Sequence, residues 1–385
     1  MADVSLDAAS LLALASETAG HEVSLDAALR PALDALTQAL TKEARLSATG
    51  LERTRARLVQ ELVQRDALAE LERGRPELAE LPVERPIIVT GFPRTGTTLL
   101  HNLLARVEGL WAPPLWQLHN PLAAEARAAA ARDHSASLLD EIYTAAPAFR
   151  AIHPMHPDWP DQCNWLLRKS FSTMANAFAW YVPGYVQFLT TSDMRPAYED
   201  HRRWLRALLD RRRRSEGQVP RLALRDPFHM WHTQALLEVY PDATIIQLHR
   251  EPAEVVPSFA SLCATLQSVD ADAPRRPAEI GRFCLFILSH GLRALEQARQ
   301  QAGDRYIDLS YRELVAAPGA VLRDLGARLG FDGSGDAVEQ AGEWLQESRA
   351  YKAGRHNYCL DDFGLVPEII EEYFESYRAR FSDRF

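Results

Sequence analysis

The chain has 385 residues, of which 47% are hydrophobic and 25% charged, and it carries a net charge of −9 at neutral pH. A chain of this length can bury a sizeable core as one large domain or as two. The negative charge argues against nucleic acid as a partner and against general affinity for anionic membranes, so an anionic ligand requires locally placed cations.

The cysteines and the N-terminus carry the signals for the compartment. Four cysteines are scattered along the chain without a Cys-x-x-Cys pair, which predicts reduced thiols and no zinc site. The N-terminal sequence MADVSLDAAS is acidic and lacks the basic region of a signal peptide. No apolar stretch approaches the roughly 20 residues of a membrane span. We therefore expect a cytoplasmic protein without a membrane span and without a metal site.

Residues 5–80 have the pattern of consecutive helices. From 51 to 73 leucines recur at helical spacing, and Gly74 with Pro76 ends the run. The segment carries no chemical motif. Residues 1–83 are therefore predicted to be a helical extension that packs on a main domain of residues 84–385, and a surface for homo-oligomerisation is the alternative role.

Residues 86–104, PIIVTGFPRTGTTLLHNLL, are the segment around which the chain is organised. The β-branched run at 87–90 predicts a strand of a parallel sheet, Gly91 and Pro93 break it, and a helix begins at Thr97. This arrangement presents backbone N–H groups and the positive end of a helix dipole to a phosphate. We therefore predict an α/β fold with a P-loop-like parallel sheet flanked by helices.

The loop differs from the Walker sequence of ATP-binding proteins. Gly91 and Gly96 have the Walker spacing, but Thr97 stands where the lysine is required. The cation is instead Arg94, inside the loop. No apolar strand ends in the Asp that would help to hold Mg²⁺. The loop is thus predicted to bind a phosphate other than that of ATP.

Aromatic residues and prolines are dense between residues 111 and 185. This helical insertion either lines the acceptor side of a cleft or belongs to the core. His153 and His156 could bind a metal, but the proline after each opposes a helix that would place both on one face. The next helix, near 196–214, ends in four arginines, which we interpret as a solvated helix end that opposes the dipole.

A second strand–helix–strand pattern begins at residue 219. VPRLALRDPFH predicts a strand, MWHTQALLEVY a helix, and residues 243–248 a buried strand. Arg250 follows that strand, and Ser258 lies on the next predicted helix. A guanidinium fork and a hydroxyl group suit a second phosphate.

These two motifs resemble those of the sulfotransferases that use 3′-phosphoadenosine 5′-phosphosulfate (PAPS). The 5′-phosphosulfate loop of that family has the form P-[KR]-[ST]-G-T-T, and its 3′-phosphate motif has the form R-[DN]-P-x-[DE]-x-x-x-S. The second motif matches 250–258, with Glu251 in place of Asp or Asn. The resemblance, to the bacterial branch of the family, covers roughly residues 84–385. The first motif matches Pro93-Arg94-Thr95-Gly96-Thr97-Thr98.

The resemblance implies a set of cofactor-binding residues. A basic segment near the C-terminus resembles the loop that closes on the 3′-phosphate, which assigns Lys352 and Arg355 to the cofactor. Leu99 stands where cytosolic relatives stack a Trp on the adenine. The 5′-phosphosulfate would be bound by Arg94, Thr95, Gly96, Thr97 and Thr98, the 3′-phosphate by Arg250 and Ser258, and the adenine by Tyr311.

The implied reaction moves a sulfuryl group from PAPS to a hydroxyl or amine without a metal. Arg94 and the loop N–H groups would stabilise the charge that grows on the bridging oxygen. His229 is predicted to be the general base, because the family has a His about twenty residues before the 3′-phosphate arginine and a pKa near 6.5 suits proton abstraction. A capping or buried structural role is the alternative for His229, and Asp161 or His156 is the second choice of base.

The acceptor is only partly constrained by the sequence. The aromatic-rich insertion favours a hydrophobic or aromatic small molecule or a lipid over a charged glycan. Arg225 occupies the place of a family Lys and would help to neutralise the transferring group. Two other classes of function remain open, a P-loop nucleotide kinase or NTPase and a non-catalytic nucleotide-binding protein.

Overall fold

The computed structural model describes residues 5–333, 338–340, 342–344, 346 and 358–385. These residues form a five-stranded sheet in the order β2-β3-β1-β4-β5, and every neighbouring pair is parallel. In its centre Ile87 lies opposite Ala223 on one side and Thr244 on the other. The predicted α/β class is confirmed. The strands are β1 (Ile87–Gly91), β2 (Leu110–Trp111), β3 (Arg221–Arg225), β4 (Thr244–His249) and β5 (Tyr306–Ser310).

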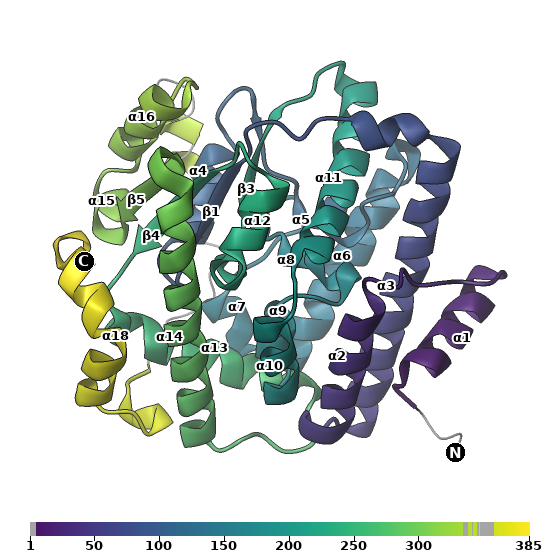
Figure 1. The fold of residues 1–385 in the computed structure, drawn as a ribbon, viewed down its shortest axis with the longest axis horizontal. Coiled ribbons are helices and arrows are strands. Elements are labelled where there is room, and N and C mark those ends of the chain that lie inside the picture. The colour runs from purple at the N-terminus through teal and green to yellow at the C-terminus, as the bar shows by residue number, and fades with distance from the viewer. Residues whose placement is uncertain (1–4, 334–337, 341, 345, 347–357) are drawn as a thin grey trace.

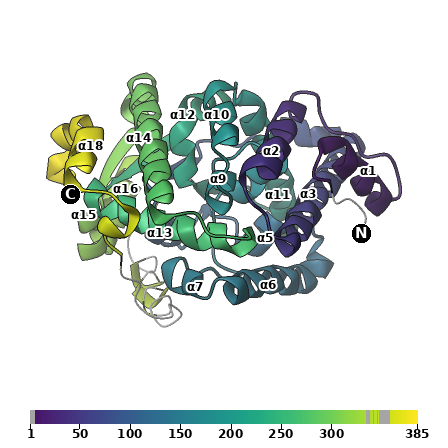
Figure 2. The same ribbon diagram turned by 90° about the horizontal axis from the view of Figure 1, so that it is seen from below.

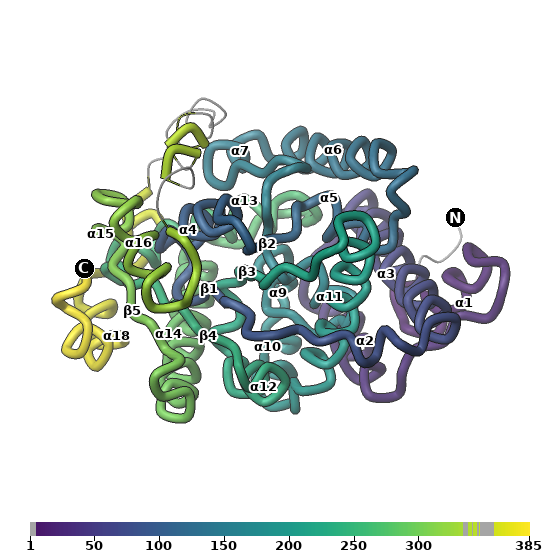
Figure 3. The backbone as a smooth tube through the Cα atoms, turned by 90° about the horizontal axis from the view of Figure 1, so that it is seen from above, coloured from purple at the N-terminus to yellow at the C-terminus, as the bar shows by residue number. Residues whose placement is uncertain are grey.

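Side chains of β1 alternate between the two faces of the sheet, as the pleat requires. Ile87 and Val89 pack with α4 (Thr97–Leu104) and α16 (Pro318–Leu329). Ile88 lies in the larger core cluster, to which α14 (Pro277–Ala302) also contributes. Figure 3 shows α4 and α14 on opposite sides of the sheet. The other helices around the sheet are α12 (Thr233–Val239), α13 (Pro252–Asp270), α15 (Tyr311–Ala316) and α18 (Pro367–Phe381).

The N-terminal helices share the core of the rest of the chain. The segments α1 (Ala8–Ala19), α2 (Arg30–Glu43) and α3 (Ala48–Gly74) lie at the end of the molecule opposite α18 (Figure 1). The larger core cluster contains Leu33 of α2, Leu62 of α3 and Ile88 of β1. The predicted boundary at residue 83 therefore does not separate two hydrophobic cores. None of the helices in the described part of the chain is long and apolar enough to cross a membrane.

The segment between β2 and β3 is helical, as predicted. Its helices α6 and α7 form an outer layer of the molecule (Figure 2). The last helix of the insertion, α11 (Arg195–Glu216), carries the four arginines near its C-terminus, and Asp210 pairs with Arg213 at 3.0 Å and Arg214 at 3.1 Å. The elements of this insertion are α5 (Leu115–His119), α6 (Ala128–Ala145), α7 (Ala148–Ile152), α8 (Asn164–Leu167), α9 (Ala175–Ala179), α10 (Pro183–Thr191) and α11 (Arg195–Glu216).

Candidate active site

The loop between β1 and α4 has an unusual backbone conformation, which leads directly into the N-terminus of α4. Arg94 has a φ of 70° and Gly96 a φ of 88°, both in the left-handed region that non-glycine residues rarely adopt. Thr95 stabilises the turn, since its Oγ1 donates to the carbonyl of Phe92 at 2.7 Å. The first N–H groups of α4, at Thr97 and beyond, have no partner within the helix. They lie where an anion would meet the positive end of the dipole.

Residues distant in sequence converge on this loop. The Nε of Arg94 donates to the hydroxyl of Ser258 at 3.2 Å, and Arg250 donates to the carbonyl of Arg94 at 2.8 Å. The guanidinium of Arg250 lies 4.6 Å from the ring centre of Tyr311. That ring packs on the loop so closely that a Cβ at Gly96 would be 2.8 Å from it. The predicted phosphosulfate, 3′-phosphate and adenine residues are therefore neighbours.

The positive charge of Arg94 has no carboxylate partner among the described residues. Burial and then the charge of Arg250 lower the pKa of Arg94, although two tyrosines act in the opposite sense. Among the described residues, no carboxylate forms an ion pair with Arg94, whereas Arg250 pairs with Glu254 at 2.8 Å. An anionic ligand would relieve the cost of burying this cation. Lys352 and Arg355 lie outside the described residues.

Arg225 at the end of β3 connects the loop to the insertion. Its side chain is only 2% exposed and donates to Thr98 Oγ1 at 2.7 Å and to Asp161 Oδ1 at 3.1 Å. Burial lowers the pKa of Arg225 and raises that of Asp161, while each charge favours the charged form of the other. This buried pair fixes the segment around Asp161 against the donor loop.

A cavity of about 910 Å³ extends from the loop to the N-terminal helix α3. Arg94, Thr97 and Thr98 line one part of it, and Arg57 and Gln64 of α3 line another. Its volume is that of a site for a ligand of several hundred daltons. Its apolar lining comes from α6, α7 and α13 and includes Leu138, Ile142, Phe149, Ile152, Leu262 and Leu266.

His153 is one of three histidines that line the cavity, with His119 and His134, and it is close enough to the donor loop for the charge of Arg94 to act on its ring. It lines the cavity directly after α7. Burial, followed by the charges of Arg225 and Arg94, lowers its pKa to about 3. The ring is therefore neutral at physiological pH, which is the form that accepts a proton.

His229 lies elsewhere. It belongs to a short turn of 3₁₀ helix, η4 (Pro227–Trp231), and is 1% exposed. Its Nδ1 is 2.9 Å from the hydroxyl of Tyr198, and burial lowers its pKa well below 6.5. The described residues that line the cavity do not include it. This placement does not support His229 as the base, because core side chains enclose the ring. Of the second choices, Asp161 lines the cavity and His156 does not.

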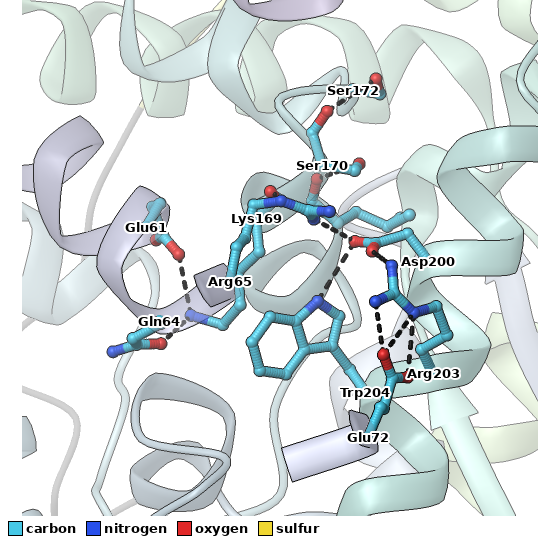
Figure 4. Close-up of polar contacts among 11 residues, drawn as sticks. Glu61, Gln64, Arg65, Glu72, Lys169, Ser170, Ser172, Asp200, Arg203 and Trp204 are labelled. Carbon is cyan, nitrogen blue, oxygen red and sulfur yellow. Dashed lines mark hydrogen bonds and ion pairs between the residues drawn. The ribbon is translucent and has the colours of Figure 1, made fainter. Parts of the chain in front are cut away.

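The contribution of α3 to the cavity was missed from the sequence. Glu61 and Gln64 line the cavity and both accept a hydrogen bond from the buried Nζ of Lys169, with 2.8 Å to Glu61 (Figure 4). Arg65 pairs with Asp200 at 2.7 Å and so anchors α3 to α11. A signal was present, because polar residues recur in α3 at helical spacing beside the leucine stripe. Those that line the cavity are Arg53, Arg57, Gln60, Glu61 and Gln64.

One cluster in the described part of the chain has the geometry to hold a metal. It consists of His21, Asp66 and Glu70, whose ligand atoms lie within 4.8 Å of one another. None of the three lines the cavity. Exposed acidic groups of this kind are common without a metal, so the cluster has no part in the candidate site.

Comparison with known sequences agrees with the motifs. A family model with the description "Sulfotransferase family" matches residues 86–334. Two curated relatives, from Mycobacterium bovis and Mycobacterium tuberculosis, are both named omega-hydroxy-beta-dihydromenaquinone-9 sulfotransferase Stf3. Each is 25% identical to this chain over 324 residues, which cover 79% of this chain and 78% of the relative.

Solved structures resemble nearly all of the chain. Sulfotransferase STF1 from Mycobacterium tuberculosis H37Rv superposes with a TM-score of 0.80 at 28% identity, covering 96% of this chain and 98% of its own. Sulfotransferase STF9 from Mycobacterium avium superposes with a TM-score of 0.83 and covers 98% of this chain and 97% of its own. At 24% identity, STF9 supports the fold alone.

Proposed function

This chain belongs to the sulfotransferase family, and from that premise we propose that it transfers a sulfuryl group from PAPS to a hydroxyl of a lipid-like acceptor. The observation that carries the donor assignment is the convergence of two arginines, Arg94 and Arg250, beside the N-terminus of α4. Two cations close together, one of them without a carboxylate partner among the described residues, suit a ligand with two separate phosphates.

The donor would be held by residues from three elements. Arg94 and the N–H groups at the start of α4 would bind the 5′-phosphosulfate, and Arg250 with Ser258 the 3′-phosphate. Tyr311, stacked under Arg250, would contact the adenine. Bound PAPS supplies an activated sulfuryl group whose leaving group is a phosphate, and Arg94 would stabilise the negative charge that this phosphate gains.

The acceptor assignment rests on the cavity and on the relatives. The side chains that line the cavity from α6, α7 and α13 are largely apolar. The curated relatives are named for an omega-hydroxy dihydromenaquinone, which supports a lipid-like hydroxyl acceptor here. The reaction would take place in the cytoplasm, in keeping with four cysteines that form no disulfide.

We assign the general base to His153 rather than to His229. Its neutral ring lines the cavity beside Arg94 and Arg225, which lower its pKa. The negative charges of a bound donor would offset both arginines and so raise this pKa towards a value suited to proton abstraction. Asp161 is the weaker candidate, because its carboxylate is already paired with Arg225.

Product formation tests the proposal directly. The purified protein is incubated with PAPS and 1-dodecanol in the presence of EDTA, and dodecyl sulfate is measured by mass spectrometry. We expect product with PAPS and none when ATP replaces it. Turnover of ATP in the presence of Mg²⁺, with no sulfated product from any of a panel of alcohols, would instead favour the kinase or NTPase alternative.

A further inference from the structure

We propose that the acceptor cavity contains a second anion-binding site, formed by Arg57 of α3 and Arg168 of η3 (Arg168–Ser170), that takes a carboxylate or phosphate group of the acceptor. This inference rests on the proposed function in one respect only, namely that the cavity receives the acceptor. It narrows the substrate class from a lipid-like alcohol to an amphiphile with a hydroxyl at one end and an anionic group at the other.

Arg168 is a partly buried cation that forms no ion pair among the described residues. It lines the cavity, and its guanidinium lies 4.6 Å from the ring centre of Trp165. Its Nε is inaccessible to solvent and has no hydrogen-bond partner among the described residues. Burial, and then the charge of Arg57, lowers its pKa to about 10, so the side chain remains charged at neutral pH. A buried charge without a hydrogen-bonded counterion is costly unless a ligand supplies one.

Arg57 adds a second charge of the same sign. It lines the cavity from α3 and lies 5.4 Å from the ring centre of Trp180. In the described part of the chain, no carboxylate lies within ion-pair distance of Arg57. Its guanidinium is close enough to Arg168 for the two positive charges to interact. Two like charges at one wall of an enclosed space repel each other, and an anion between them would remove the repulsion.

The neighbouring carboxylates are already engaged. Glu61 accepts from Lys169 at 2.8 Å (Figure 4), and Asp270 pairs with Arg53 at 2.9 Å. Asp226 favours the charged form of Arg168 but is not hydrogen-bonded to it, and burial raises the pKa of Asp226 to about 7. The protein therefore does not neutralise Arg57 and Arg168 through direct pairs among its described residues, although it does so for their neighbours Lys169 and Arg53.

The arrangement also separates this site from the donor site. The donor loop has its own cations, Arg94 and Arg250, whereas the strongest charges acting on Arg168 are those of Arg57 and Glu61 on α3. Apolar side chains of α6, α7 and α13 complete the same cavity. An acceptor that presents its hydroxyl to the donor loop would place its chain on this apolar wall and its anionic group at α3.

The first test measures binding, without catalysis. Dodecanoate and 1-dodecanol are titrated by calorimetry into the full-length wild type and into Arg57→Gln and Arg168→Gln. We expect dodecanoate to bind the wild type and to lose about tenfold or more in affinity in each variant, with 1-dodecanol unchanged. Arg55→Gln, on the same helix but not among the cavity-lining residues, should behave as the wild type. Arg168→Lys should recover part of the loss, which a purely structural role would not explain.

Dodecanoate that binds the wild type, Arg57→Gln and Arg168→Gln equally well would overturn the proposal. A titration with inorganic phosphate alone shows whether the site binds the anionic group of an acceptor or a free anion. If phosphate binds as tightly as dodecanoate and displaces it, the site takes a free ion, and the assignment to the acceptor is wrong.

The second test uses turnover with a matched pair of acceptors. The KM for 12-hydroxydodecanoate should rise about tenfold in Arg168→Gln, and the KM for its methyl ester should not change. Equal effects on the two acceptors would contradict the anion site. Failure of any acceptor to be sulfated would count against the proposed function alone, because the calorimetric result stands without it.

Discussion

At the scale of single residues, the candidate site depends on groups that are buried and charged. Arg225 is 2% exposed and joins Thr98 of the donor loop to Asp161 of the insertion. Such pairs contribute little net stability when intact, but removal of one partner leaves an uncompensated charge. The positions of Arg225 and Asp161 thus make the alignment of the donor and acceptor sides sensitive to a single substitution.

Replacement of this arginine should therefore destabilise the fold as well as the site. We expect Arg225→Met to lower the free energy of unfolding by roughly 3–5 kcal/mol, as measured by urea denaturation. The double variant Arg225→Met/Asp161→Leu should recover part of the loss, because no unpaired carboxylate remains buried. A loss below about 1 kcal/mol in the single variant would show that the pair is not buried as described.

The role of His153 as the general base can be tested by a single substitution. His153→Ala should lower kcat by about 10²–10⁴-fold and leave the affinity for 3′,5′-bisphosphoadenosine nearly unchanged. His156→Ala is the matched control, since that imidazole is close in sequence but does not line the cavity. Near-normal turnover by His153→Ala, with a large loss in His229→Ala or Asp161→Asn, would return the base to one of those residues.

The pH profile follows from the same assignment. The pKa of His153 is about 3 in the free protein, so the ring is already deprotonated above pH 5. The value of kcat/KM for PAPS, which reports on the free enzyme, should therefore show no acid limb from this group between about pH 5 and 8. A base with an ordinary imidazole pKa would instead produce a limb near pH 6.5.

At the scale of elements, the loop and α4 were predictable and the wall formed by α3 was not. The strand from Ile87 and the helix from Thr97 were confirmed, because β-branched and apolar periodicity specifies them locally. Residues 5–80 were also correctly predicted as helical. The place of α3 beside the cavity depends on distant pairs such as Arg65–Asp200, which no local pattern encodes.

The orientation of His229 is a second feature that the local sequence pattern does not determine. Its spacing from Arg250 agreed with the family, and it does follow β3. However, the turn η4 directs the ring towards Tyr198, and the direction of a side chain after a strand is not fixed by spacing. By contrast, the residues predicted around the loop converge as expected, because parallel strands β1 and β4 end at the same edge of the sheet.

The loop itself can be tested through a pair of glycines. Gly96 has a φ of 88°, and a Cβ there would be 2.8 Å from the Tyr311 ring. Gly109 has a similar φ of 79° but nothing within 4 Å of its Cβ position. Both Gly→Ala variants should lose about 1 kcal/mol of stability to backbone strain. Only Gly96→Ala should also weaken 3′,5′-bisphosphoadenosine, measured by calorimetry, and equal affinities in the two variants would contradict the role of the Tyr311 contact.

At the scale of the whole molecule, buried histidines make stability depend on pH. Burial lowers the pKa of His101 and His201 to about 3 and that of His232 to about 4. Since the unfolded value is near 6.5, the unfolded chain binds more protons below that pH, and stability falls as the pH falls. Asp226 acts in the opposite sense, because its pKa is raised to about 7. Burial raises the pKa of Asp161 as well, so two carboxyl groups oppose the three histidines, which outnumber them.

The melting temperature should accordingly decrease from pH 7 to pH 5. His201→Gln removes one of the three buried histidines that take up a proton on unfolding. The variant should therefore show a weaker dependence of the melting temperature on pH, as measured by differential scanning calorimetry at several pH values. A melting temperature that rises on acidification over the same range would show that the histidines are not buried in the neutral form.

The arginines of the candidate donor site stand out against the negative net charge of the chain. The chain carries −9 overall, yet Arg94, Arg225 and Arg250 gather at the edge of the sheet beside α4. A protein that is negative as a whole attracts a polyanion only through such a local arrangement. We therefore propose that these cations form two phosphate subsites for one nucleotide.

Calorimetric titration of 3′,5′-bisphosphoadenosine and of AMP, both in EDTA, tests the two subsites. The bisphosphate should bind at least about tenfold more tightly than AMP, because only it reaches Arg250 and Ser258. In Arg250→Ala the bisphosphate should fall to the affinity of AMP, while AMP itself is unaffected. Equal affinities of the two nucleotides for the wild type, or binding that requires Mg²⁺, would contradict the two-subsite donor site.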